Sequence, residues 1–159
     1  MYIPAAFRVS EEATILSFIE RYDFSTIVTS SASDGMVATH VPVLVKRDGD
    51  RVVLQGHVAR ANEHWRSFDG RTQALAIFHG PHGYVSPTWY AGGDNVPTWN
   101  YAVVHAYGRP RLLEDAGAAR RWPATSRSFS TPRAGSTALW SGIWRAPTRS
   151  GARSGRRRW

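Results

Sequence analysis

All six histidines of the chain lie between His40 and His105, and most of the other amphipathic side chains share that stretch. These other side chains are Trp65, Trp89, Trp99, Asn100 and Tyr101. Such a high density of aromatic and polar side chains is typical of a pocket for a planar polar ligand, because the rings stack on the ligand and the polar groups hydrogen-bond to it. Aromatic residues in strands more often belong to a core, so the cluster is more informative than any single member.

Several common kinds of site are excluded or disfavoured by the sequence. The chain contains no cysteine, which removes thiolate catalysis, disulfides and Cys-ligated metal. His79 and His82 lie three residues apart across a Gly-Pro pair rather than on a helix, and no HExxH motif occurs, so a metal site is disfavoured. No GxSxG, GxGxxG or GxxxxGK[ST] motif occurs either, and Ser86 is followed by Pro87. A nucleotide would therefore be held by strand side chains and loop amides, and no residue stands out as a catalytic acid, base or nucleophile.

The hydrophobic pattern predicts one amphipathic helix followed by many short strands. Ser10 is the expected cap of a helix over residues 11–22, with Ile15, Phe18, Ile19 and Tyr22 on one face. Alternation then predicts strands over residues 24–30, 36–46, 51–58, 73–79, 84–90 and 96–107, with residues 108–113 closing the body. Asn62 is the expected cap of a short helical segment over residues 63–68. This order predicts a mainly β, antiparallel barrel with minor helices, and one convincing helix is too few for a helix-turn-helix reader of DNA.

The net charge of +8 belongs entirely to the C-terminal part of the chain. Residues 1–113 hold ten basic and ten acidic side chains, whereas residues 114–159 hold ten arginines against Glu114 and Asp115. Residues 116–159 also hold four of the seven tryptophans and use only ten amino-acid types. Three interpretations remain open: an Arg-Trp arm that binds nucleic acid, a solvated disordered tail, or the product of a shifted reading frame in a GC-rich gene.

Several long motifs in residues 1–113 resemble the PaiB family of FMN-binding negative transcriptional regulators. The motifs are Ala38-Thr-His-Val-Pro42, Gly56-His-Val-Ala-Arg-Ala-Asn62, Ala76-Ile-Phe-His-Gly-Pro-His82, Tyr84-Val-Ser-Pro-Thr-Trp-Tyr90 and Val96-Pro-Thr-Trp-Asn-Tyr101. The resemblance implies a split β-barrel, a homodimer with FMN at the subunit interface, and gene repression. The N-terminus shows no signal-peptide pattern and no apolar run is long enough to span a bilayer, so a cytoplasmic location is expected.

The resemblance also implies two groups of cofactor-binding residues. One group would lie near the phosphate and ribityl chain, with Arg60 on the phosphate: His57, Arg60, Asn62, His64 and Trp65. Thr39 and His40 would join this group from a neighbouring strand. The other group would frame the isoalloxazine: Ser86, Trp89, Thr98, Trp99, Asn100 and Tyr101. No catalytic residue and no metal ligand is assigned.

The C-terminal part departs from the family pattern, in which further helices and a near-terminal Lys-x-Ser-Gln-Asn-like segment follow. The last lysine here is Lys46 and the last asparagine is Asn100. We therefore expect a barrel domain over residues 1–115 that lacks its last strands and has an open sheet edge, followed by a tail over residues 116–159. Two alternative functions remain: a flavin-dependent oxidoreductase, and nucleic-acid binding through the basic tail.

Overall fold

The structure is a computed structural model that describes residues 3–31, 35–93, 95–113 and, for the backbone alone, 137–145. It contains one α-helix, α1 (Glu12–Arg21), and three short 3-10 helices, η1 (Ala5–Phe7), η2 (Glu63–Ser67) and η3 (Pro87–Trp89). The strands are β1 (Phe24–Ser31), β2 (Gly35–Asp48), β3 (Arg51–Ala59), β4 (Ala74–Val85), β5 (Thr98–Leu112) and β6 (Thr137–Arg145). None of the described helices is long and apolar enough to span a membrane.

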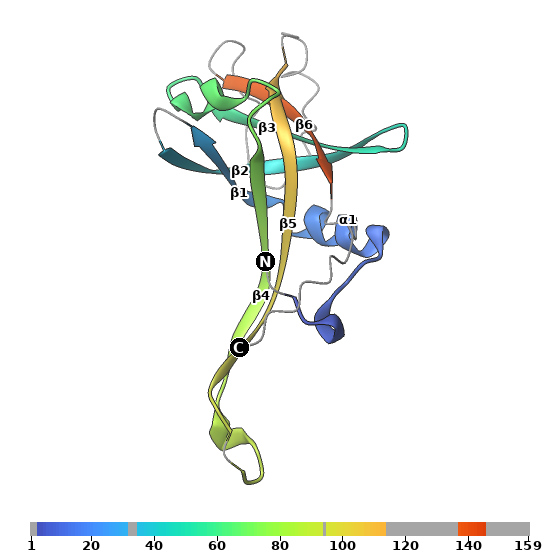
Figure 1. Cartoon of the computed structure of the whole chain (residues 1–159), viewed down its shortest axis with the longest axis vertical. Helices are drawn as coiled ribbons and strands as arrows, with labels where there is room; N and C mark the ends of the chain where they lie inside the picture. Colours follow the sequence, from blue (N-terminus) through green and yellow to red (C-terminus); the bar gives the residue numbers. More distant parts are fainter. Residues whose placement is uncertain (1–2, 32–34, 94, 114–136, 146–159) are drawn as a thin grey trace, which may run out of the picture.

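The six strands form a closed antiparallel barrel in the order β1-β2-β3-β6-β5-β4 (Figure 1). Side chains alternate between the barrel interior and its outer face, as strand geometry requires. On β1, Ser25, Ile27 and Thr29 are buried while the residues between them are not. The apolar interior is completed by residues of the other strands, chiefly Val41, Val43, Leu54, Val58, Ala76 and Phe78. The predicted antiparallel barrel is therefore confirmed.

The predicted helix forms almost as expected, and its cap differs. α1 packs Ile19 into the core, with Ile15 and Phe18 partly buried beside it. The residue at the N-cap position is Glu11, and no side chain there accepts a capping hydrogen bond. The prediction of Ser10 as the cap was wrong by one position, which is within the usual uncertainty of helix ends.

The largest correction concerns residues 73–112. Two strands joined by a turn at residues 80–83 were predicted, but the structure has one strand, β4, with a register shift between His79 and His82. Pro81 lies in this irregular stretch, where a strand tolerates a residue that donates no hydrogen bond. Residues 87–89 form η3 rather than strand, and the two segments predicted over residues 96–113 are the single strand β5.

As a result β4 and β5 run together well beyond the barrel as a long hairpin (Figure 1). The described part of the chain between them includes η3 at the far end. We call residues 80–103 the arm.

The barrel also differs from the expected open edge. β6 lies between β3 and β5 and pairs with both, so it supplies the strand that closes the barrel. Residues 114–136 and 146–159, where most of the predicted tail falls, lie outside the described residues. The domain boundary at residue 115 and the three interpretations of the tail stay predictions.

Candidate functional site

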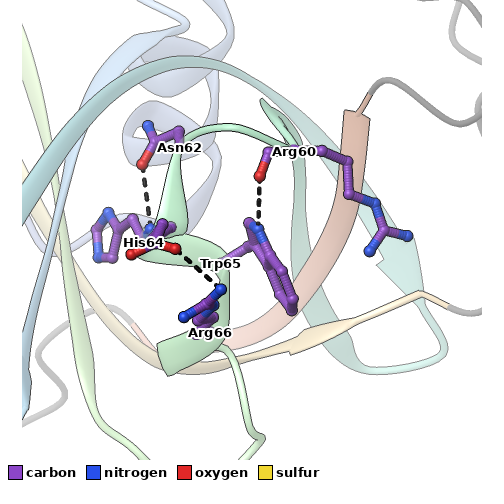
Figure 2. A network of polar contacts seen from close by, with 6 residues as sticks. Arg60, Asn62, His64, Trp65 and Arg66 are labelled. Carbon is purple, nitrogen blue, oxygen red and sulfur yellow. Dashed lines mark hydrogen bonds and ion pairs between the residues drawn. The ribbon is translucent and has the colours of Figure 1, made fainter.

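The segment between β3 and β4 carries most of the predicted phosphate-side residues and folds over one end of the barrel (Figure 1). Asn62 begins η2, because its side-chain oxygen accepts a hydrogen bond from the His64 backbone N–H at 3.1 Å. This confirms the predicted cap. Figure 2 shows the result: the Asn62 and His64 side chains lie on one side of η2, and the Arg60 side chain lies on the other.

The His64 ring enters the barrel end and joins two neighbouring strands. Its Nδ1 lies 2.8 Å from Thr39 Oγ1 on β2, and its Nε2 lies 2.8 Å from Thr29 Oγ1 on β1. Thr29 Oγ1 lies 3.0 Å from Ser67 Oγ, and the Ser67 hydroxyl donates to the His64 carbonyl at 2.8 Å. The Asn62 side-chain amide donates to Thr39 Oγ1 at 3.1 Å. We call Thr29, Thr39, Asn62, His64 and Ser67 the polar plug.

The hydrogen-bond directions in the polar plug follow from counting protons. Ser67 uses its hydroxyl proton on the His64 carbonyl, so its oxygen accepts from Thr29. Thr29 has then used its own proton and accepts from Nε2–H of His64. The ring is therefore the Nε2–H tautomer, and its Nδ1 accepts from the Thr39 hydroxyl.

Burial reinforces the neutral form of this histidine. His64 is 4% exposed, and desolvation lowers the pKa of its imidazole below the ordinary value of 6.5. Both ring nitrogens already have partners inside the protein, so the ring holds Asn62 and Thr39 in place and offers no free polar atom to a ligand. Its placement near the phosphate and ribityl chain stays a prediction, in which His64 acts by positioning its neighbours.

Trp65 and Arg60 form a second unit on the exposed side of η2. The Trp65 indole N–H donates to the Arg60 carbonyl at 3.0 Å (Figure 2). The Arg60 guanidinium carbon lies 5.4 Å from the Trp65 ring centroid, and the Arg66 guanidinium carbon lies 5.7 Å from it. Arg66 is bound to Glu63 at 2.9 Å, whereas Arg60 forms no ion pair within the described part of the chain. Of the two guanidiniums beside Trp65, that of Arg60 is therefore the one without an acidic partner among the described residues.

His40 and His57 belong to the outer face of the barrel. His40 is adjacent to Thr39 in sequence but points to the opposite face, where its Nδ1 lies 2.9 Å from Thr26 Oγ1. His57 lies between the inward-facing Gly56 and Val58 on β3, and partial burial lowers its pKa. The structure therefore does not bring these two histidines into the polar plug.

The six residues predicted to frame the isoalloxazine all lie on the arm. Thr98 to Tyr101 pair with residues Val85 to His82 of β4. Ser86 begins η3 and its hydroxyl lies 2.8 Å from Thr88 Oγ1. Trp89 is 70% exposed, Trp99 57% and Tyr101 66%. The arm end and the η2 end of the barrel lie at opposite ends of β4, so a single chain does not bring the two predicted groups together (Figure 1).

Two hydroxyls of the polar plug were not predicted from the sequence, those of Thr29 and Ser67. Thr29 carries a usable signal, because it occupies an inward position of a strand in phase with Ile27, where an apolar residue is expected. Ser67 had no such signal, because its role depends on the turn of η2. Within the described residues, no group of three or more His, Asp or Glu side chains is placed to hold a metal ion.

Comparisons with known structures support the fold. The FAD and heme binding protein of Mycobacterium smegmatis matches with a TM-score of 0.58 and 15% identity, over 86% of this chain and 70% of that one. A protein of Listeria innocua described as a "Putative Pyridoxamine 5'-phosphate oxidase" matches with a TM-score of 0.55 and 18% identity, over 84% of this chain and 92% of that one. At these identities the likeness shows the fold alone, and it confirms the predicted split barrel.

Comparisons at the level of sequence are more specific. The "Protease synthase and sporulation protein PAI 2" of Bacillus subtilis is 40% identical over 114 residues, which are 72% of this chain and 54% of that protein. An uncharacterized protein of Saccharomyces cerevisiae, YKL070W, is 38% identical over 96 residues, which are 55% of this chain and 57% of that protein. The chain thus spans little more than half the length of these relatives.

A family model described as "Putative FMN-binding domain" matches residues 1–141. The match extends past residue 113, where the motif resemblance stopped, and reaches into β6. The resemblance drawn from the motifs is confirmed: the chain belongs to the FMN-binding domain family of the PaiB type.

Proposed function

We propose that the chain binds FMN between two copies of itself and acts as a negative transcriptional regulator of the PaiB type. One observation carries the proposal: the guanidinium of Arg60, which has no acidic partner among the described residues, lies beside η2, while the exposed rings lie along the arm. FMN needs a cation for its phosphate and flat surfaces for its ring system. A site that uses both groups is completed by two chains.

The phosphate end is supported by the chemistry around Arg60. Its backbone carbonyl is fixed by the Trp65 indole, and its guanidinium lies over the Trp65 ring without an acidic partner among the described residues. A guanidinium presents paired N–H donors that match a phosphate, and an ion pair with a nearby carboxylate would compete for them. Asn62, held by the polar plug, begins η2 and so supports the segment that carries Arg60 and Trp65.

The ring end is supported by the exposure of the arm. Trp99 packs edge-on against Tyr84 with ring centroids 6.0 Å apart, and lies 6.1 Å from the His82 ring. These side chains form an exposed aromatic surface with hydrogen-bonding tips, which suits stacking on an isoalloxazine. Bound FMN would supply reversible electron transfer, and the surrounding side chains would tune its potential.

The regulatory part of the proposal comes from the relationship to the PAI 2 protein, whose name refers to protease synthesis and sporulation. The described residues contain one α-helix, so they offer no helix-turn-helix pair to read DNA directly. For the described residues, the proposal therefore assigns regulation to flavin binding and not to a helix pair that reads DNA.

The test is a titration of the purified full chain with FMN, followed by quenching of flavin and tryptophan fluorescence. In Arg60→Ala the phosphate loses charge-assisted hydrogen bonds that contribute roughly 1.5–3 kcal/mol, so the Kd should rise about 10- to 150-fold. Arg66→Ala is the matched control, because it removes an equal charge on the other side of Trp65 that Glu63 already neutralises. An equal loss in both variants, or no loss in Arg60→Ala, would contradict the assignment.

A further inference from the structure

The arm leaves two sheet edges without a strand partner within the described part of the chain. β4 pairs with β1 only over Ala74 to Phe78, and β5 pairs with β6 only over Tyr107 to Leu112. Beyond these limits the two strands of the arm pair with each other alone. The open edges are residues 79–85 of β4 and residues 98–106 of β5. A two-stranded ribbon of this length is marginally stable in water and needs cover.

The two edges differ in how they are protected against pairing. The β4 edge carries Pro81 and the register shift between His79 and His82, both of which disturb a ladder. The β5 edge runs from Thr98 to Ala106 with no proline, no glycine and no Asp, Glu, Lys or Arg. Edge strands of proteins that avoid association normally contain such residues. The β5 edge therefore lacks the features that prevent an edge strand from pairing with a strand of another molecule.

The near absence of charged residues from the arm restricts the kind of partner that it can bind. Asp94 is the one Asp, Glu, Lys or Arg among its 24 residues, although such residues make up 20% of the chain. Nucleic acid and anionic membrane surfaces are bound through Lys and Arg, which the arm lacks. A neutral protein surface with its own open edge and exposed rings fits this chemistry, and a second copy of the arm is such a surface.

The exposed area of the arm is of the size that a dimer needs. Tyr84, Trp89, Tyr90, Trp99 and Tyr101 are each between 47% and 70% exposed. Because a buried aromatic side chain covers roughly 150–250 Å², these five rings offer on the order of 500 Å² per chain. A standard interface buries about 800 Å² per partner, so the rings together with the paired backbone come close to that area.

We propose that two copies of this chain associate by pairing their β5 edges, residues 98–106, antiparallel about a two-fold axis. Antiparallel pairing of a strand with its own copy is self-complementary, as a two-fold interface must be. The ribbon of each arm then becomes half of a four-stranded sheet, and the rings of Trp99 and Tyr101 pack beside those of the second copy. This inference rests on the homodimer proposed above and assigns the surface that makes it.

The absence of cysteine from the chain makes a direct test available. Single cysteines are placed in turn at Thr98, Asn100 and Ala102 on the edge, with Met36→Cys as the control because Met36 is exposed but lies on β2. In the dimer at least one edge position lies near the axis and forms an intermolecular disulfide on mild oxidation, whereas the control does so only at the slow rate of random collision. Light scattering of the unmodified full chain should give the mass of a dimer.

A second variant tests the interface without relying on disulfide geometry. Trp99→Lys with Tyr101→Lys places like charges across the axis and should convert the dimer to a monomer with an unchanged circular dichroism spectrum. Phe7→Lys, at an apolar side chain 80% exposed outside the arm, should leave the dimer intact.

A monomer in the unmodified chain would overturn the inference, as would edge cysteines that cross-link no faster than Met36→Cys. Cover of the edge by residues 146–159 of the same chain would also overturn it, and would show as a monomer with β5 amides protected from exchange. The FMN titration separates this inference from the function proposed above. A dimer that binds no flavin keeps the interface and removes that function. A dimer that binds flavin but does not cross-link through β5 keeps the function and removes this interface, and a monomer that binds flavin contradicts both the interface and the placement of FMN between two copies.

Discussion

The polar plug makes a sharp prediction about one buried hydroxyl, that of Thr29. The change is Thr29→Val, which keeps the shape and the β-branching of the side chain and removes only the hydroxyl. Thr29 is 1% exposed, and its hydroxyl accepts from His64 Nε2–H at 2.8 Å and donates its proton to Ser67 Oγ at 3.0 Å. Valine removes both hydrogen bonds and leaves the His64 N–H facing methyl groups.

The expected cost follows from those two contacts. A buried donor left without an acceptor costs roughly 1–3 kcal/mol, and each lost hydrogen bond contributes about 1 kcal/mol net, so we expect a loss of about 2–3 kcal/mol in the free energy of unfolding. A change of tautomer does not relieve the loss. If the proton moved to Nδ1, the Thr39 hydroxyl would lose its acceptor and Nε2 would still face valine.

The matched control is Thr26→Val, the same substitution on the same strand but on the opposite face. Thr26 Oγ1 lies 2.9 Å from Nδ1 of the exposed His40, where water replaces a lost partner, so we expect a change below about 0.5 kcal/mol. Urea unfolding followed by tryptophan fluorescence measures both free energies. Equal effects in the two variants would refute the assignment of Thr29 to a buried, fully used network.

Three further outcomes are expected. Long-range 15N–1H spectra of the folded chain at neutral pH should show His64 as the Nε2–H tautomer, and an Nδ1–H signal would contradict the proton count. Gly80→Ala should destabilise the chain by about 1–3 kcal/mol in urea, because a Cβ there would lie 2.5 Å from Phe18 Cζ, whereas Gly83→Ala, with nothing within 4 Å, should be close to neutral. Stability should fall as the pH drops below 6.5: burial lowers the pKa values of His57, His64 and His105 in the folded state, so the unfolded state binds more protons in that window. A urea midpoint that is unchanged between pH 7 and pH 5 would show that these histidines do not control acid stability.

The parts of the fold that sequence predicted well are those governed by periodicity. Alternation located β1, β2 and β3 to within two residues, and the apolar stripe located α1, because each pattern depends only on which face meets the core. The cap at Asn62 was also predictable, since a side-chain oxygen before a short helical turn has one main use there.

The parts that sequence missed are those decided by distant residues. The stretch Gly80-Pro81-His82-Gly83 has the composition of a turn, but pairing with residues Asn100 and Tyr101 keeps it extended. The closing of the barrel by β6 was missed because the composition of residues 116–159 resembles a tail, while its pairing partners lie on β3 and β5. The candidate site divided for the same reason, because the length of the β4–β5 hairpin, which separates the two predicted groups, depends on pairing between residues far apart in the sequence.

Burying polar residues inside the barrel costs desolvation free energy, so we expect the polar plug to have a role other than stability. Ile27, Val41 and Val43 fill the interior with apolar groups, while the end beneath η2 is closed by Thr29, Thr39 and His64. Apolar side chains of similar volume would close it at lower desolvation cost, because a buried polar network gains little net free energy even when every group is paired. What the network adds is direction, since the donors run in one order, from the Asn62 amide through Thr39, His64, Thr29 and Ser67 to the His64 carbonyl. We therefore infer that the network is kept for the position of Asn62 and of η2, which is the position that the proposed phosphate site at Arg60 depends on.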